Sequence, residues 1–115
     1  MTEKSRICLC AVVALNAAIL PVGCKRSPQV QEAQFLKRGA ALMAKKDYGR
    51  ALLEFRNASK VMPKDSEPHY QLGLAYLASG SAATAIRELY SATQLNPKHA
   101  AAQLKLAELM TTSQN

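Results

Sequence analysis

Few side chains in this sequence could carry out catalysis. The chain has two histidines, His69 and His99, and a catalytic histidine needs a reacting group within hydrogen-bonding reach. The sequence shows neither a Ser-His-Asp nor a Cys-His set, nor a carboxylate cluster that would make a metal site with them. Glu54 and Glu88 stand at positions related by an internal repeat, which favours a surface or packing role over an acid–base pair. We therefore predict that the protein is not an enzyme and holds no metal or other cofactor.

Residues 1–23 have the order of a secretory signal. Lys4 and Arg6 make the start basic, and 18 uncharged residues follow at positions 7–24. An uncleaved membrane anchor is the alternative, although a span needs about 20 apolar residues and this run contains an asparagine and a proline. Because Cys8 and Cys10 fall inside the predicted signal, the exported chain would have no disulfide.

The end of this run, LPVGC at positions 20–24, resembles the lipobox of bacterial lipoproteins. In that family a small residue precedes a cysteine, which is lipidated and becomes the new N-terminus. Gly23 and Val22 match the pattern, whereas Pro21 stands where the family usually has leucine. The resemblance implies that Cys24 is lipidated and anchors the protein to a membrane. Ordinary signal cleavage beside an unmodified cysteine is the alternative.

Residues 24–31 are polar and contain Pro28, so we expect a short tether. Lys25 and Arg26 could contact anionic lipid head groups, at about 1 kcal/mol each, while acyl chains would supply most of the affinity. In the lipoprotein family the residue after the cysteine influences sorting. Lys25 is not the aspartate that implies retention in the inner membrane. The expected location is therefore the outer membrane, facing the periplasm.

The rest of the chain contains an internal repeat. Residues 32–65 align with residues 66–99 without a gap, and an internal repeat of this length is typical of helical arrays. Small residues and prolines recur in register, and large apolar residues replace one another between them. The identical pairs are Gly39/Gly73, Ala41/Ala75, Ala44/Ala78, Ala51/Ala85, Glu54/Glu88, Ala58/Ala92, Pro63/Pro97 and Lys64/Lys98.

Each unit is expected to form two helices. The first unit would have a helix over residues 33–45, and Asp47 would cap a second helix whose apolar residues recur at helical spacing. That helix would end before Pro63, since proline disfavours helix at the preceding residue. In the second unit, Ser66 is expected to cap the first helix and residues 82–95 to form its partner.

These units resemble the tetratricopeptide repeat (TPR), a helix–turn–helix unit of about 34 residues. Small residues stand where helices cross closely, and a proline ends each unit. Phe35, Arg38 and His69 depart from the family's usual residues. The resemblance implies an all-α solenoid with two full repeats at residues 32–65 and 66–99. The residues that carry its structural pattern are Gly39, Ala51, Phe55, Ala58, Pro63, Gly73, Tyr76, Ala85, Leu89, Ala92 and Pro97.

Residues 100–113 continue the register as the first helix of a third unit. An array usually needs at least three units to bury its core, and this helix lacks the polar outer face of a terminal repeat. We expect it to pack on a partner or on a second copy, which makes self-association possible. Alternatively, the chain is a shortened version of a longer array.

The charge and composition limit the choice of partner. The chain has 115 residues, a net charge of +7, 49% hydrophobic residues and only 5% aromatic residues. A basic balance can attract nucleic acid, but the basic residues are scattered, aromatic stacking residues are few and the predicted signal indicates export. We therefore expect no nucleic-acid partner.

The resemblance implies that the first helices of successive units line a concave groove that accepts a protein or peptide. The polar residues that bind carboxylate tails in some TPR proteins are absent, so an apolar or amphipathic segment is the expected ligand. Packing in the core is the alternative role for some of these side chains. The predicted groove residues are Leu36, Lys37, Ala40, Met43, Tyr70, Gln71, Leu74, Leu77, Leu104 and Lys105.

The sequence thus predicts a lipid-anchored TPR adaptor that binds protein. It is also weakly similar to TPR lipoproteins of exosortase and exopolysaccharide systems. The remaining alternatives are a membrane-spanning or cytoplasmic TPR adaptor with an uncleaved N-terminus, and a remnant of a longer array.

Overall fold

A computed structural model of the chain describes residues 25–114. The predicted signal at residues 1–23 and the predicted lipidation site Cys24 lie outside these residues. Residues 25–114 contain helices and no strand, which confirms the predicted all-α fold. The helices are α2 (Pro28–Ala44), α3 (Tyr48–Val61), α4 (Glu67–Ala78), α5 (Ala82–Leu95) and α6 (Ala100–Thr112).

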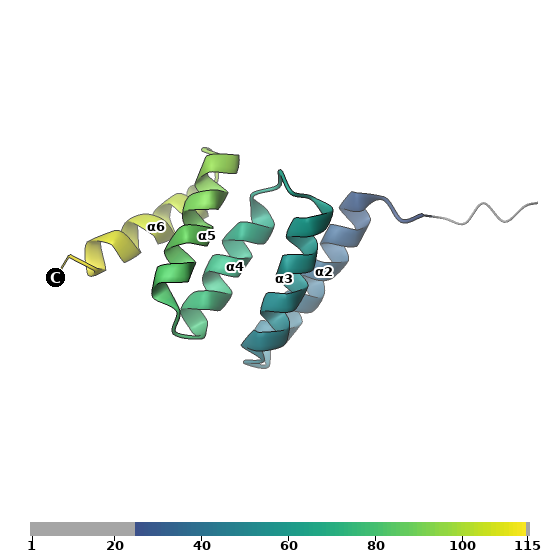
Figure 1. Cartoon of the computed structure of the whole chain (residues 1–115), viewed down its shortest axis with the longest axis horizontal. Coiled ribbons are helices and arrows are strands. Elements are labelled where there is room, and N and C mark those ends of the chain that lie inside the picture. Colours follow the sequence, from purple (N-terminus) through teal and green to yellow (C-terminus); the bar gives the residue numbers. More distant parts are fainter. Residues whose placement is uncertain (1–24, 115) are drawn as a thin grey trace, which may run out of the picture.

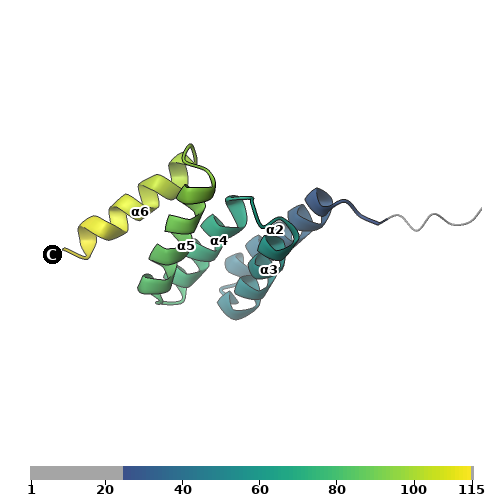
Figure 2. The same ribbon diagram turned by 45° about the horizontal axis from the view of Figure 1, so that its top comes forward.

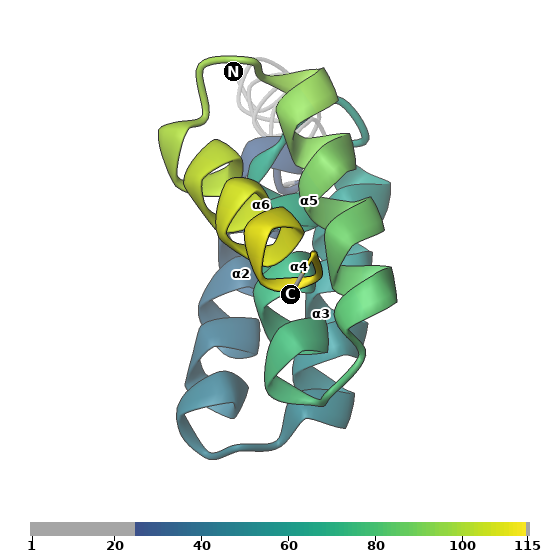
Figure 3. The same ribbon diagram turned by 90° about the vertical axis from the view of Figure 1, so that its left-hand side faces the viewer.

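The helices form a repeat solenoid, as predicted. Each packs against the next, and the closest pairs are α2 with α3 and α4 with α5. The helices follow one another along the long axis of the molecule (Figures 1 and 2). Viewed along that axis, α2 and α6 lie on one side and α3 and α5 on the other (Figure 3). This arrangement places the first helices of the units on a common surface.

Helix α2 begins earlier than the sequence predicted. It starts at Pro28 rather than at residue 33, so the predicted tether is wrong over residues 28–31. The Oγ of Ser27 accepts a hydrogen bond from the backbone N–H of Val30 at 3.3 Å. Proline suits the first helical turn because the amide it lacks would have no partner there. Pro28 therefore starts a helix where the sequence predicted irregular chain.

Local side-chain contacts define the starts of α3 and α4. Asp47 caps α3 as predicted, because its Oδ1 accepts from the amide of Arg50 at 3.3 Å. The cap of α4 differs from the prediction. Ser66 stands at the capping position without a side-chain bond, and the Oδ1 of Asp65 accepts instead from the amide of Glu67 at 2.9 Å. A carboxylate one residue earlier thus replaces the predicted hydroxyl cap.

The two turns within the units have the same backbone conformation. Lys46 has a φ of 60°, and Gly80, at the equivalent position of the second unit, has a φ of 88°. Glycine adopts this left-handed region at little cost, whereas a residue with a side chain is strained there. The repeat geometry therefore imposes the conformation on Lys46, which the sequence alone would not suggest.

Small residues let the helices of each unit approach closely. Phe55 and Leu89 are fully buried, and they face Gly39 and Gly73. A Cβ at Gly39 would overlap the ring of Phe55, and one at Gly73 would lie 2.7 Å from the Cγ of Leu89. The main core cluster joins the two units and contains Ala51, Phe55, Leu72 and Ala75.

Candidate functional site

The predicted groove residues lie on α2, α4 and α6, the first helices of successive units. Lys37, Ala40 and Leu104 are exposed, and the other predicted groove residues are half-buried. Leu36 and Met43 also pack against the main core cluster. These two side chains therefore contribute to the core as well as to the surface.

The apolar part of the predicted groove is most exposed near α6. The side chain of Leu104 is 63% exposed, whereas Leu36 and Tyr70 are half-buried. The ring of Tyr70 lies against that of His99, with their centroids 4.8 Å apart. Tyr70 is thus held by the residue that precedes α6, so α4 and α6 share one surface.

Two of the three polar groove residues are bonded within their own helices. The Nε2 of Gln71 donates to the Oε1 of Glu67 at 2.7 Å, and the Nζ of Lys105 lies 2.7 Å from the Oε2 of Glu108. The hydrogen bond from Lys105 to Glu108, together with the negative charge of Glu108, raises the pKa of Lys105 above its usual value. Lys37 is exposed, so it is the most accessible charge among the predicted groove residues.

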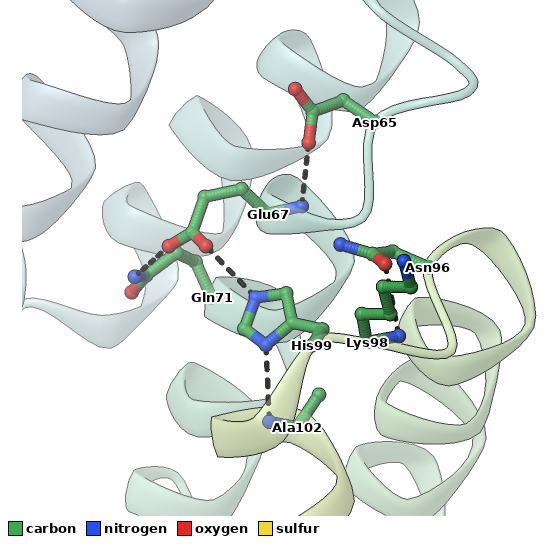
Figure 4. Close-up of polar contacts among 7 residues, drawn as sticks. All are labelled: Asp65, Glu67, Gln71, Asn96, Lys98, His99 and Ala102. Carbon is green, nitrogen blue, oxygen red and sulfur yellow. Dashed lines mark hydrogen bonds and ion pairs between the residues drawn. The ribbon is translucent and has the colours of Figure 1, made fainter.

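His99 connects α4 to α6 at the edge of this surface (Figure 4). Its Nδ1 accepts from the amide of Ala102 at 3.2 Å and so caps α6. Because Nδ1 accepts, Nε2 carries the proton in the neutral ring, and it lies 3.0 Å from the Oε2 of Glu67. The sequence did not predict the contact of His99 with Glu67, which depends on how two units are placed.

Glu32 is a buried carboxylate beside this edge. It is only 7% exposed, and its Oε1 has no hydrogen-bond partner among the described residues. Burial raises the pKa of Glu32 above its usual value. The nearby carboxylates of Asp65 and Glu67 raise it further. The sequence offered no sign of this cluster, since Glu32 and Asp65 lie at opposite ends of the first unit and Glu67 belongs to the second.

Replacing Glu32 with glutamine is expected to stabilise the protein by about 1 kcal/mol at pH 7, because it removes a poorly solvated charge. A raised pKa means that the folded state binds the proton more tightly than the unfolded state does. Glu32 therefore contributes most to the free energy of unfolding at pH values below 4.5, its pKa in the unfolded chain. This contribution declines as the pH rises through the pKa of Glu32 in the folded protein. The melting temperature of E32Q, measured across this pH range, should change less with pH than that of the wild type.

The matched control for that prediction is Glu108→Gln, since Glu108 is a half-exposed glutamate. E108Q should not gain stability at neutral pH. An E32Q variant that melts at or below the wild-type temperature at pH 7 would contradict the proposed cost of the buried charge.

The histidines and repeat-related glutamates form separate pairs. His69 Nδ1 lies 2.8 Å from Glu88 Oε2, and Arg38 Nε donates to Glu54 Oε2 at 2.9 Å. Each contact joins the two helices of one unit, which fits the surface or packing role predicted for both glutamates. Within residues 25–114, no group of three or more histidine, cysteine or acidic side chains could hold a metal ion.

The end of the solenoid carries an apolar hollow between α5 and α6. Its volume is about 430 Å³, and its lining includes Leu106, Ala107 and Met110 from α6 and Pro97 from the preceding loop. Met110 is 53% exposed. No helix within residues 25–114 covers this face of α6, so it is open to a partner.

Comparison with known proteins identifies the repeat. Residues 66–109, which include α4, α5 and much of α6, match the family model described as tetratricopeptide repeat. A search of curated proteins gives no significant match. None of the helices described between residues 25 and 114 is long and apolar enough to cross a membrane.

Proposed function

We propose that this protein is a non-enzymatic adaptor of the tetratricopeptide repeat class, which mediates protein–protein binding, and that it binds its partner on α2, α4 and α6. The main support is the apolar surface shared by Tyr70 on α4 and the exposed Leu104 on α6. An apolar or amphipathic segment would bury both side chains, and such anchors carry much of the energy of an interface.

Crosslinking in cells tests the binding surface. A photoreactive residue at exposed position 37 should trap a specific partner, and the double variant Y70A/L104A should lower the yield at least about tenfold, since two anchors are lost. The matched control is L53A/Y90A, which removes a leucine and a tyrosine that are 55% and 56% exposed on α3 and α5. Equal losses in the two double variants would contradict the assignment of the surface.

We also propose that Cys24 is lipidated and holds the adaptor at the outer membrane, facing the periplasm. The support is the lipobox-like sequence that ends at Cys24 and the basic residues that follow it. Intact-mass measurement of the protein from the membrane fraction should show a chain that begins at Cys24 and carries acyl groups. A chain that retains Met1 and carries no acyl mass would contradict the anchor and favour an uncleaved adaptor.

A second copy is the alternative partner, through α6. The support is the uncovered apolar hollow that contains Leu106 and Met110. Sedimentation of the purified full chain should then show a dimer, and Met110→Asp should convert it to a monomer because the charge would be buried in the interface. If the wild-type chain sediments as a monomer, α6 does not mediate self-association, and the hollow would bind a different protein.

A further inference from the structure

A hollow of about 400 Å³ lies at the start of α2, beside the first described residues (Figure 1). Its lining consists of Arg26, Gln31, Gln34, Phe35 and Arg38. We propose that this arginine pocket binds the phosphate of an anionic phospholipid head group. The proposal deepens the anchoring function above and rests on it for the position of the pocket at the membrane.

Arg26 is held against α2 by two hydrogen bonds. Its Nη1 donates to the Oε1 of Gln34 at 2.8 Å, and its carbonyl accepts from the Nε2 of Gln31 at 2.7 Å. No carboxylate of the described residues forms an ion pair with Arg26. Its guanidinium thus keeps its full charge and several N–H donors for a ligand, and guanidinium groups match phosphate oxygens in a bidentate way.

Arg38 contributes a second guanidinium from farther along α2. Its Cζ lies 4.7 Å from the centroid of the Phe35 ring, so the ring fixes the position of the charge. The Nε of Arg38 donates to Glu54 at 2.9 Å, which leaves its terminal nitrogens for other acceptors. Because Glu54 offsets part of this charge, Arg26 is expected to supply the larger share of the attraction.

The charge of the chain is gathered in the same half as the pocket. Residues 25–65 contain ten Lys and Arg against four Asp and Glu, whereas residues 66–115 contain three of each kind. The whole excess of positive charge after Cys24 therefore belongs to the first unit and the residues just before it. An anionic surface would attract this half of the molecule and would not attract the half that contains α6.

The proposed anchor would place the pocket among the head groups. Arg26 follows Cys24 by two residues, and an extended chain spans at most about 3.6 Å per residue. The backbone of Arg26 therefore lies within about 7 Å of a lipidated Cys24. Since α2 begins at Pro28, no long tether separates the rest of the pocket from the lipid surface.

Fluorescence quenching in mixed micelles tests the proposal on the full chain. Because the protein has no tryptophan, Phe35→Trp places a single reporter in the pocket and keeps an aromatic ring there. Brominated phosphatidylglycerol should quench this tryptophan at a mole fraction about tenfold lower than brominated phosphatidylcholine, since two arginines are near the membrane surface. Equal quenching by the two lipids would overturn the proposal.

Matched variants in the F35W chain separate the pocket from diffuse charge. R26Q/R38Q should abolish the preference for phosphatidylglycerol, and K45Q/K60Q, which removes the same charge from elsewhere on the first unit, should keep it. R26K/R38K should lose most of the preference, because lysine retains the charge without the planar fork. Equal losses in R26Q/R38Q and K45Q/K60Q, at unchanged melting temperatures, would overturn a specific pocket.

Two competitors identify the source of the phosphate. Inorganic phosphate and an acidic peptide should restore little fluorescence if a lipid head group is the ligand. Recovery with either competitor, at concentrations comparable to that of the lipid, would overturn the lipid assignment. The intact mass of the same sample reports acylation of Cys24. Lost selectivity in an acylated chain counts against the pocket alone, and preserved selectivity in an unacylated chain counts against the anchor alone.

Discussion

Replacing Phe55 with alanine is expected to lower the free energy of unfolding by about 3–5 kcal/mol. Phe55 is fully buried and belongs to the cluster that includes Leu72 and Ala75 of α4. Its ring also lies over Gly39 of α2. Removal of the ring would leave a cavity where α2, α3 and α4 meet, and Gly39 has no side chain that could fill it. A small repeat array is marginally stable, so the loss approaches the stability of the whole domain.

Urea unfolding followed by circular dichroism measures this effect. The control is Leu53→Ala in the same helix, since Leu53 is mostly exposed and its truncation should change the stability by less than about 0.5 kcal/mol. If F55A does not fold, Phe55→Leu supplies the measurement, with an expected loss between those of the two alanine variants. Similar losses in F55A and L53A would refute the central role of Phe55.

Replacing Gly39 with alanine is expected to destabilise the protein by about 1–3 kcal/mol. Alanine favours a helix over glycine by about 1 kcal/mol, so helix propensity alone predicts the opposite sign. The overlap between a Cβ at position 39 and the ring of Phe55 outweighs this gain, because both groups lie in the packed interior. The sign of the change therefore decides between local propensity and helix contact.

Gly49→Ala is the matched control, because Gly49 also lies in a helix and a Cβ added there would meet no atom within 4 Å. G49A should raise the melting temperature slightly, whereas G39A should lower it. The double variant G39A/F55L should show coupling between the two sites, since a smaller side chain at position 55 relieves the overlap. A G39A protein as stable as G49A would show that α2 and α3 can separate at little cost.

The repeat register predicted most of the fold. Helix α5 has the predicted bounds of Ala82–Leu95, because Asn96 and Pro97 end it as clearly in the sequence as in the structure. The start of α2 was predicted less well. A proline after a serine occurs both in loops and in the first turn of a helix, and only the bond between Ser27 and Val30 distinguishes the two.

The candidate sites were less predictable than the helices. The predicted groove residues follow from the register of one helix at a time, and the sequence could therefore assign them to α2, α4 and α6. The contact of Glu67 with His99 and the burial of Glu32 depend on which side chains meet across turns or units. The arginine pocket lies along α2, but it depends on how the residues before the helix fold back onto it. Phe35 and Arg38 departed from the usual residues of the family, and that departure was the signal that could have indicated the pocket.

Position 107 has a consequence for the addition of further repeats. Ala107 is exposed on α6 at the position equivalent to Gly73, where an added Cβ would lie 2.7 Å from the Cγ of Leu89. An incoming helix built like α3 or α5 could not seat its large side chain at the same depth. Helix α6 is therefore a mismatched acceptor for a copy of the first two units. Elongation of the array in register would require glycine at position 107 or a small residue on the added helix.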